Sequence, residues 1–173
     1  GANALQMQIA IGSESEFIGV INLLDRNAVF YTDSSGSTPE VVEIPEEYKQ
    51  EAADLREVLV ERIAELDEAL TIKFLEGEEI SLEELKKALR KAVIANLAAP
   101  VFCGSSLKNK GVQLVLDAVI DYLPSPLDIP PVTATLVRDG SEVLRHSVDS
   151  EPMSALVFKI VSDPYMGRLA YLR

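Results

Sequence analysis

The 173-residue sequence predicts an α/β fold that contains an inserted α+β segment, and three observations support this class. Residues 5–44 contain short β-rich stretches separated by turn residues. Residues 45–93 carry apolar side chains at helical spacing, and residues 99–123 place a short apolar strand directly before an amphipathic helix. The last order is typical of a parallel α/β unit, whereas the first two together are typical of a small sheet covered by helices.

The N-terminal part predicts a small antiparallel sheet. Residues 5–11 alternate apolar and polar side chains, residues 17–24 and 28–32 are β-rich, and residues 41–44 form a short strand. Between them, Asp33-Ser-Ser-Gly36 matches the D-x-x-G pattern of a magnesium loop. These residues also favour turns, and no parallel strand precedes them, so an ordinary turn is predicted.

Three helical segments should follow. Pro45 suits the first position of a helix, and the helix has an apolar stripe of Leu55, Val58, Leu59, Ile63, Leu66 and Leu70. A shorter piece runs through Ile72 to a stop at Gly77. The third helix starts at Ser81, where Ser81 and Glu84 form a capping box. Its predicted buried face consists of Leu82, Leu85, Leu89 and Val93.

The C-terminal part predicts a strand, a helix, a linker and a hairpin. Residues 99–104 are wholly apolar, which favours a strand buried on both faces. The helix 110–123 should face inward with Val112, Val115, Leu116, Val119 and Ile120. The proline-rich stretch 124–131 is typical of a stiff linker. Residues 155–162 and 168–173 flank Asp163–Gly167 as a hairpin, and both chain ends are expected to be cuts.

The charge is strongly acidic, with 28 acidic and 16 basic residues and a net charge of −12. This balance disfavours binding of free nucleic acid. Glu57, Glu61 and Glu65 stack at i, i+4 spacing, as a solvated face or as a docking surface for a protein. Lys86, Lys87 and Arg90 form a basic cluster, which either pairs with local acids such as Glu83 or contacts a partner.

Several chemistries lack the residues they need. Cys103 is the single cysteine and His146 the single histidine, so neither a disulfide framework nor a metal cluster is expected. The single cysteine fits a reducing compartment, and Cys103 itself should be a small core residue. No G-x-x-x-x-G-K-[ST] loop is present. No apolar run reaches the roughly 20 residues of a membrane span.

The segment Cys103–Gly111 is the strongest candidate site. Its small residues lie between a strand and a helix, where free backbone N–H groups can donate to a carbonyl or phosphate oxygen. The alternative is an ordinary tight turn.

At this segment the chain resembles the elongation factor G family of translational GTPases. The resemblance rests on Pro100–Gln113 (PVFCGSSLKNKGVQ) and Asp121–Pro131 (DYLPSPLDIPP). It extends to Ile44–Tyr48, Phe74–Glu79, Phe158–Ile160 and Asp163–Leu169 in the same order. It therefore spans nearly the whole chain.

The resemblance implies a division of the chain. Residues 1–11 and 98–124 would be the end of a P-loop GTPase domain, and residues 12–97 its inserted subdomain. Residues 125–152 would be a proline-rich linker, and residues 153–173 the first hairpin of a β-barrel domain. Ser105, Ser106 and Leu107 would be the guanine-binding loop, with Ser106 in place of the usual alanine.

The resemblance also implies a function for an intact parent protein. That protein would bind GTP or GDP with Mg²⁺ and hydrolyse GTP to move tRNA and mRNA on the ribosome, in the cytoplasm, with the stalk protein as a partner. The fragment alone is expected to be inactive, with no cofactor and no membrane. The alternatives are a stand-alone docking module that uses the acidic helices, and a related translational GTPase.

Overall fold

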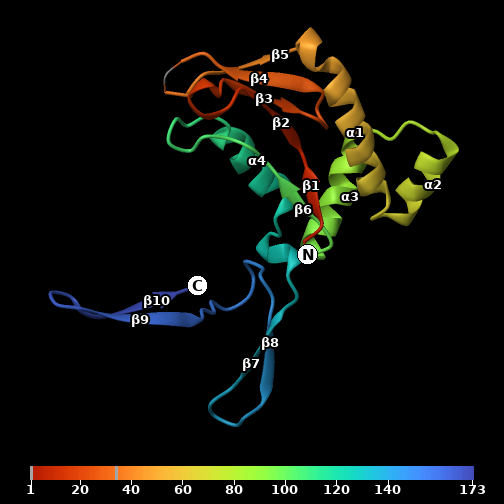
Figure 1. The fold of residues 1–173 in the computed structure, drawn as a ribbon. Helices are drawn as coiled ribbons and strands as arrows, with labels where there is room; N and C mark the ends of the chain where they lie inside the picture. The colour runs from red at the N-terminus through yellow and green to blue at the C-terminus, as the bar shows by residue number, and fades with distance from the viewer. Residues whose placement is uncertain (1, 34) are drawn as a thin grey trace. The chain divides into compact units, whose positions relative to one another are not determined.

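A computed structural model describes residues 2–33 and 35–173, so Gly1 and Ser34, the latter within the predicted turn, lie outside the described residues. The chain divides into two compact units, Gly1–Leu123 and Pro124–Arg173. Figure 1 shows the elements of each unit, which are described separately below. Both helices and sheets are present, as the predicted α/β class requires.

The first unit contains two sheets joined at Met7. Strand β1 (Ala4–Gln6) pairs in parallel with β6 (Ala99–Val101). Strands β2 (Gln8–Ile11), β3 (Gly19–Asn22), β4 (Asn27–Tyr31) and β5 (Pro39–Val42) form an antiparallel sheet in that order. The antiparallel sheet is confirmed, but the single strand predicted over residues 5–11 is wrong. The Met7 N–H donates to the Val101 carbonyl at 3.0 Å, while the Met7 carbonyl accepts from the Leu23 N–H at 3.0 Å. The strand therefore changes partner at this residue.

Most predicted helix signals hold, but the first helix ends at Ala64, so Leu66 and Leu70 of its predicted stripe lie beyond it. A 3₁₀ turn η2 (Glu46–Tyr48) follows Pro45 and leads into α1 (Lys49–Ala64), and a second 3₁₀ turn η1 (Glu14–Glu16) precedes β3. Helix α2 (Glu68–Glu76) ends at Gly77, which adopts φ +71°, a left-handed conformation that suits glycine. Helix α3 (Leu82–Ile94) begins with both hydrogen bonds of the predicted capping box, and α4 (Val112–Tyr122) follows β6.

The antiparallel sheet is covered on both faces, because neighbouring strand residues point to opposite sides. Ile9, Ile21 and Ala28 lie in one cross-strand row and belong to the main core, which includes Leu59 and Ile63 of α1 and Leu85 and Leu89 of α3. Val20 and Val29 face the other side and form a smaller cluster with Phe17 and Tyr31. Cys103 and Leu114 pack against this second cluster, so the segment after β6 and the start of α4 cover that face (Figure 1).

Some predicted buried positions are exposed. Val58 of α1 and Leu82 of α3 are partly open to solvent. Four residues of the predicted inward face of α4 are exposed: Val115, Leu116, Val119 and Ile120, the last at 76%. Strand β6 is not buried on both faces either, since Val101 is 48% exposed. Helical spacing identifies an apolar face but cannot say whether another segment covers it.

The second unit consists of two hairpins. The predicted hairpin is confirmed as β9 (Val157–Asp163) and β10 (Gly167–Leu172). The segment predicted as a linker contains a 3₁₀ turn η3 (Pro126–Asp128) and a further hairpin, β7 (Val132–Thr135) with β8 (Glu142–Arg145). The two strands of this further hairpin have four residues each, which is too short for a clear alternation of apolar and polar side chains, so the sequence did not predict it. Among the described residues, no helix has the length and apolar character needed to cross a bilayer.

Replacement of Leu85 by Ala should destabilise the first unit strongly, because Leu85 is 0% exposed at the centre of the main core. A loss of about 2–5 kcal/mol is expected for a buried leucine. Leu82→Ala, one turn earlier and 38% exposed, is the matched control and should cost about 1 kcal/mol or less. Urea unfolding followed by far-UV circular dichroism measures both. Equal losses would contradict the placement of α3.

Candidate functional site

The loop Cys103–Gly111, which connects β6 to α4, is closed by its own backbone. The Ser105 N–H donates to the Lys110 carbonyl at 2.8 Å, and the Lys110 N–H donates back to the Ser105 carbonyl at 3.0 Å. The Lys108 N–H also donates to the Ser105 carbonyl, at 3.2 Å. Ser106 and Leu107 therefore form the tip, and Leu107 is 95% exposed.

The tip keeps two backbone donors available. Within the part of the chain that the structure describes, the N–H groups of Ser106 and Leu107 have no acceptor. The Ser106 carbonyl, in contrast, accepts from the Asn109 N–H at 3.1 Å. Exposed backbone donors of this kind can bond to an oxygen of a ligand.

Two glycines allow the base of the loop to close. Gly111 has φ +83°, and a Cβ there would lie 2.8 Å from the Cys103 carbonyl oxygen. A Cβ at Gly104 would lie 2.7 Å from the Lys110 oxygen. Any side chain at either position would push the two arms of the loop apart.

A row of three amide side chains holds the start of the loop. The Gln8 Oε1 accepts from the Cys103 N–H at 3.1 Å, and its Nε2 donates to Asn22 Oδ1 at 2.8 Å. Asn22 Nδ2 in turn donates to Asn27 Oδ1 at 2.8 Å. Gln8, Asn22 and Asn27 are paired across β2, β3 and β4, and the first two are buried. These residues share no motif in the sequence, and only the strand register brings them together.

The other predicted chemical candidates have structural roles. Cys103, predicted as a core residue, is half-buried and packs against the second cluster, and its burial raises the pKa of its thiol. The Asp33 carboxylate accepts from the Ser37 N–H at 3.0 Å and from the Ser35 hydroxyl, which holds its pKa well below the usual range. No group of three or more possible metal ligands is found among the described residues.

The predicted basic cluster is partly engaged within the fold. Lys86 Nζ lies 3.3 Å from Asp25 and 3.7 Å from Asp121. Arg90 donates to the carbonyls of Ile120 and Asp121 at the end of α4. Lys87 is exposed. Lys86 and Arg90 therefore link α3 to the end of α4, and Lys86 also links α3 to the turn after β3.

The acidic stripe of α1 is differently placed. Glu57, Glu61 and Glu65 are all exposed, and none of them forms an ion pair within residues 2–33 and 35–173. Three like charges on one open helix face repel one another slightly in the free chain.

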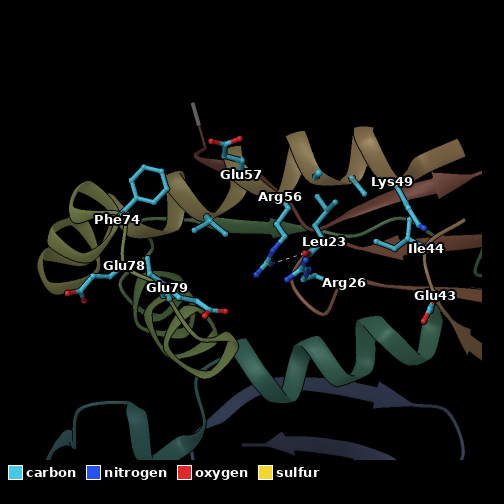
Figure 2. Close-up of a pocket in the computed structure, with 15 residues that line it drawn as sticks. Leu23, Arg26, Glu43, Ile44, Lys49, Arg56, Glu57, Phe74, Glu78 and Glu79 are labelled. Carbon is cyan, nitrogen blue, oxygen red and sulfur yellow. Dashed lines mark hydrogen bonds between the residues drawn. The ribbon is translucent and has the colours of Figure 1, made fainter. Parts of the chain in front are cut away.

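Beside this stripe lies an open groove of about 820 Å³. Figure 2 shows Arg26 and Arg56 near the centre of the residues that line it, with Glu43, Glu57 and Glu79 around them. Arg56 Nη1 donates to the carbonyls of Leu23 and Leu24 at 3.0 and 3.1 Å. Arg56 therefore supports the turn after β3, and the mixed charges around the groove do not select a ligand of one sign.

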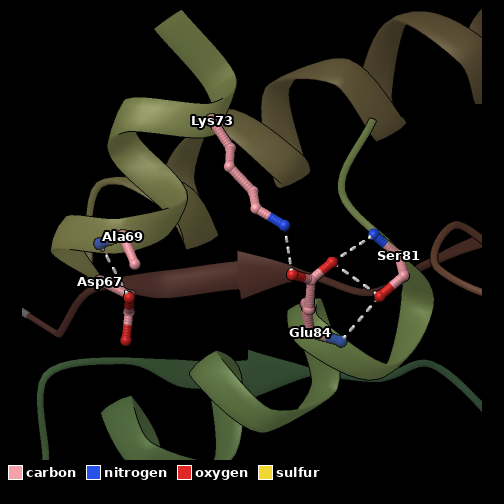
Figure 3. A network of polar contacts seen from close by, with 5 residues as sticks. All are labelled: Asp67, Ala69, Lys73, Ser81 and Glu84. Carbon is pink, nitrogen blue, oxygen red and sulfur yellow. Dashed lines mark hydrogen bonds and ion pairs between the residues drawn. The ribbon is translucent and has the colours of Figure 1, made fainter. Parts of the chain in front are cut away.

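A polar network fixes α2 against α3, as Figure 3 shows. Glu84 accepts from Lys73 Nζ at 2.6 Å and from the N–H and hydroxyl of Ser81 at 3.0 and 2.8 Å. These bonds lower the pKa of Glu84 to about 2, with the Lys73 bond as the largest cause. Asp67 caps α2 by accepting from the Ala69 N–H at 3.1 Å.

Comparison with known proteins places the chain in a class. No family model matches it. A protein of Thermus thermophilus of known crystal structure superimposes with a TM-score of 0.74 at 29% identity, over 98% of this chain and 23% of the other. Elongation factors G of Thermotoga neapolitana and Thermotoga maritima are each 54% identical over 172 residues, which is 99% of this chain. The chain spans about a quarter of the length of these relatives.

The sequence relatives define the class as the translation elongation factors, and the Thermus thermophilus structure shares the fold. Within that class, the chain corresponds to a segment of elongation factor G.

Replacement of Glu84 by Gln should lower stability near neutral pH but not in strong acid. The folded-state pKa of Glu84 is depressed from its ordinary value of 4.5 to about 2. Its contribution is therefore complete above about pH 4.5 and is lost as the pH falls towards 2. Urea unfolding of wild type and Glu84→Gln across this range should give a gap that closes in acid. Glu83→Gln, which removes a neighbouring carboxylate outside the network, is the control; a gap independent of pH would contradict the assignment.

Proposed function

We propose that the chain forms the guanine-binding end of the GTPase domain of a ribosomal translocation factor, together with the inserted subdomain. In this proposal residues 1–11 and 98–124 belong to the GTPase domain, residues 12–97 to the insert, and residues 153–173 to the start of a β-barrel domain. Strand β2 (Gln8–Ile11), at the end of the first of these segments, pairs with β3 and so completes the sheet of the insert. The observation that carries the proposal is the exposed pair of N–H donors at Ser106 and Leu107. They lie in a chain that is 54% identical to elongation factor G over 99% of its length.

The two donors are suited to recognise guanine. Guanine presents a carbonyl oxygen where adenine presents an amino group. An N–H donor can therefore bond to guanine, whereas it would face a second donor in adenine. A site that donates to a ligand oxygen rejects an analogue without it, because the donor is then left unpaired. Ser105, the first residue predicted for the guanine-binding loop, shapes that loop through its two backbone bonds to Lys110.

The remaining parts of such a site must come from elsewhere in a longer protein. GTP and Mg²⁺ supply the phosphate chemistry there, and the described residues offer no phosphate loop. The exposed apolar residues of α4 and the two-stranded β1–β6 sheet support this arrangement, because both suit packing against further strands and helices. In this proposal the longer protein hydrolyses GTP in the cytoplasm and moves tRNA and mRNA on the ribosome.

The acidic stripe of α1 supports a second function, the docking of a protein. Its three carboxylates repel one another and have no ion-pair partner among the described residues. A basic surface, such as one on the ribosomal stalk protein, would relieve this repulsion on binding. The sequence marks both the acidic residues and the basic cluster as possible docking residues. Lys86 and Arg90 already contact Asp25, Asp121 and the end of α4, so the proposal uses the acidic stripe.

The 173-residue chain alone should bind GDP only weakly and should not hydrolyse GTP. When it replaces the matching segment of the Thermotoga maritima elongation factor G, the resulting chimera should bind GDP tightly and reject ADP. Fluorescent GDP titrated against both proteins, with fluorescent ADP as the control, measures this difference. Micromolar GDP binding by the chain alone, or a chimera that does not prefer GDP, would contradict the proposal.

Charge reversal at Glu61 should weaken docking of the stalk protein at least about threefold, because one favourable charge contact becomes repulsive. Glu142→Lys makes the same change of charge on β8 and is the matched control. Isothermal titration of the stalk protein at low and moderate salt measures the affinities. Equal weakening by both variants would mean that net charge, and not the α1 stripe, governs binding.

A further inference from the structure

The loop Cys103–Gly111 contacts the segments that connect the strands of the insert, and four of its side-chain hydrogen bonds end on main-chain oxygens there. Lys108 Nζ donates to the Ser15 carbonyl at 3.3 Å, and Lys110 Nζ donates to the Phe17 carbonyl at 3.0 Å. Both lysines of the loop are thus directed to the insert.

The closest contact involves Gly36, in the connection between β4 and β5. Gln113 Nε2 donates to the Gly36 carbonyl at 2.9 Å, and Asn109 Nδ2 approaches the carbonyls of Ser35 and Gly36 at 3.3 and 3.4 Å. Asn109 adopts φ +53°, a left-handed conformation that asparagine tolerates better than most residues. Its side chain therefore fixes a strained point of the loop to the insert.

The two backbones also touch directly. A Cβ at Gly36, which has φ +60°, would lie 2.5 Å from the Lys108 carbonyl oxygen and 2.6 Å from that of Asn109. The Asp33 carboxylate shapes the same connection by accepting from the N–H groups of Ser37 and Thr38 at 3.0 and 3.4 Å. The Asp33 carboxylate is thus bonded to two backbone N–H groups of the residues that follow Gly36.

We propose that the inserted sheet sets the position of the two donor N–H groups, and that Asn109 and Gln113 are positioning residues for selection of the guanine base. This inference rests on the proposed function of the loop. Neither side chain needs to touch the nucleotide. Both act through the Gly36 carbonyl on the stretch Lys108–Lys110, whose backbone bonds to Ser105 define the tip.

The support has a chemical consequence. An N–H donor selects a carbonyl oxygen over an amino group only if it is held at hydrogen-bonding distance and angle. A loosened loop can move away from an unfavourable amino group, so it loses selectivity more than it loses binding.

The first test uses the 173-residue chain itself. Asn109→Ala and Gln113→Glu each remove a donor to the Gly36 carbonyl, and the second keeps the size of the side chain. Amide hydrogen exchange at Ser105 and Lys110 should become roughly three- to tenfold faster, the size expected for the loss of one hydrogen bond. Exchange at Val20 and Val29, in the centre of the sheet, should be unchanged. Unchanged exchange at Ser105 and Lys110 would overturn the proposal.

The second test uses the chimera with Thermotoga maritima elongation factor G. The affinities for GDP and for the diphosphate of 2,6-diaminopurine riboside, in which an amino group replaces the guanine oxygen, give a selectivity ratio. Asn109→Ala and Gln113→Glu should reduce this ratio about three- to tenfold. If a variant only destabilised the protein, the affinities for both ligands would fall by the same factor and the ratio would not change. Gln50→Ala, which removes an amide bonded to Asp54 on α1, is the matched control.

The outcomes separate the two proposals. If the wild-type chimera does not prefer GDP to ADP, the proposed function fails and the positioning role fails with it. If the wild type selects guanine and the variants keep the same ratio, only the positioning role is overturned. Lys108→Ala provides a milder third variant, since its partner Ser15 is reached through a single bond near the surface. If either main variant does not fold, a normal ratio for Lys108→Ala counts against the proposal.

Discussion

The parallel pairing of β1 with β6 is the constraint on which the rest of the first unit depends. It places residues 4–6 beside residues 99–101, so the whole insert leaves and returns at neighbouring strands. Met7 extends this junction, because its N–H bonds to β6 while its carbonyl bonds to the turn after β3. The insert and the loop after β6 therefore share one rigid base. A parallel pair needs a long connection, and here that connection is a folded subdomain with its own core.

The face of the insert that contacts the loop combines apolar packing with hydrogen bonds from amide side chains. Val20, Val29 and Tyr31 supply the apolar surface against which Cys103 packs. The amides of Gln8, Asn22 and Asn27 supply a row of buried and partly buried hydrogen bonds that ends on the Cys103 N–H. An amide buried without partners would be costly, so this row fixes one register of the sheet and one position of the loop. Apolar contacts alone would tolerate small shifts of either element.

Features that depend on neighbouring residues could be predicted from the sequence, whereas contacts between distant residues could not. The capping box at Ser81, the end of α2 at Gly77 and the turn at Asp163–Gly167 depend on neighbouring residues, and all three are confirmed. The break at Met7 was missed because the alternation of residues 5–11 is continuous while the pairing changes. The exposed face of α4 was assigned inward because spacing does not reveal what covers a helix. The contacts of Asn109, Gln113 and Gln8 join residues more than 70 positions apart, so no local sequence pattern predicts them.

The loop illustrates a general division of labour between the residues that bind and the residues that hold them. Its tip must keep the N–H groups of Ser106 and Leu107 without internal acceptors, since a donor already satisfied within the chain would select nothing. Water solvates such exposed donors at little cost, but water does not fix their direction. Their direction must come from the backbone hydrogen bonds between Ser105 and Lys110. That part of the chain is in turn hydrogen-bonded to the carbonyls of Gly36 and Phe17 in the insert. The subdomain that interrupts the sheet is thus also the surface that gives the loop its shape.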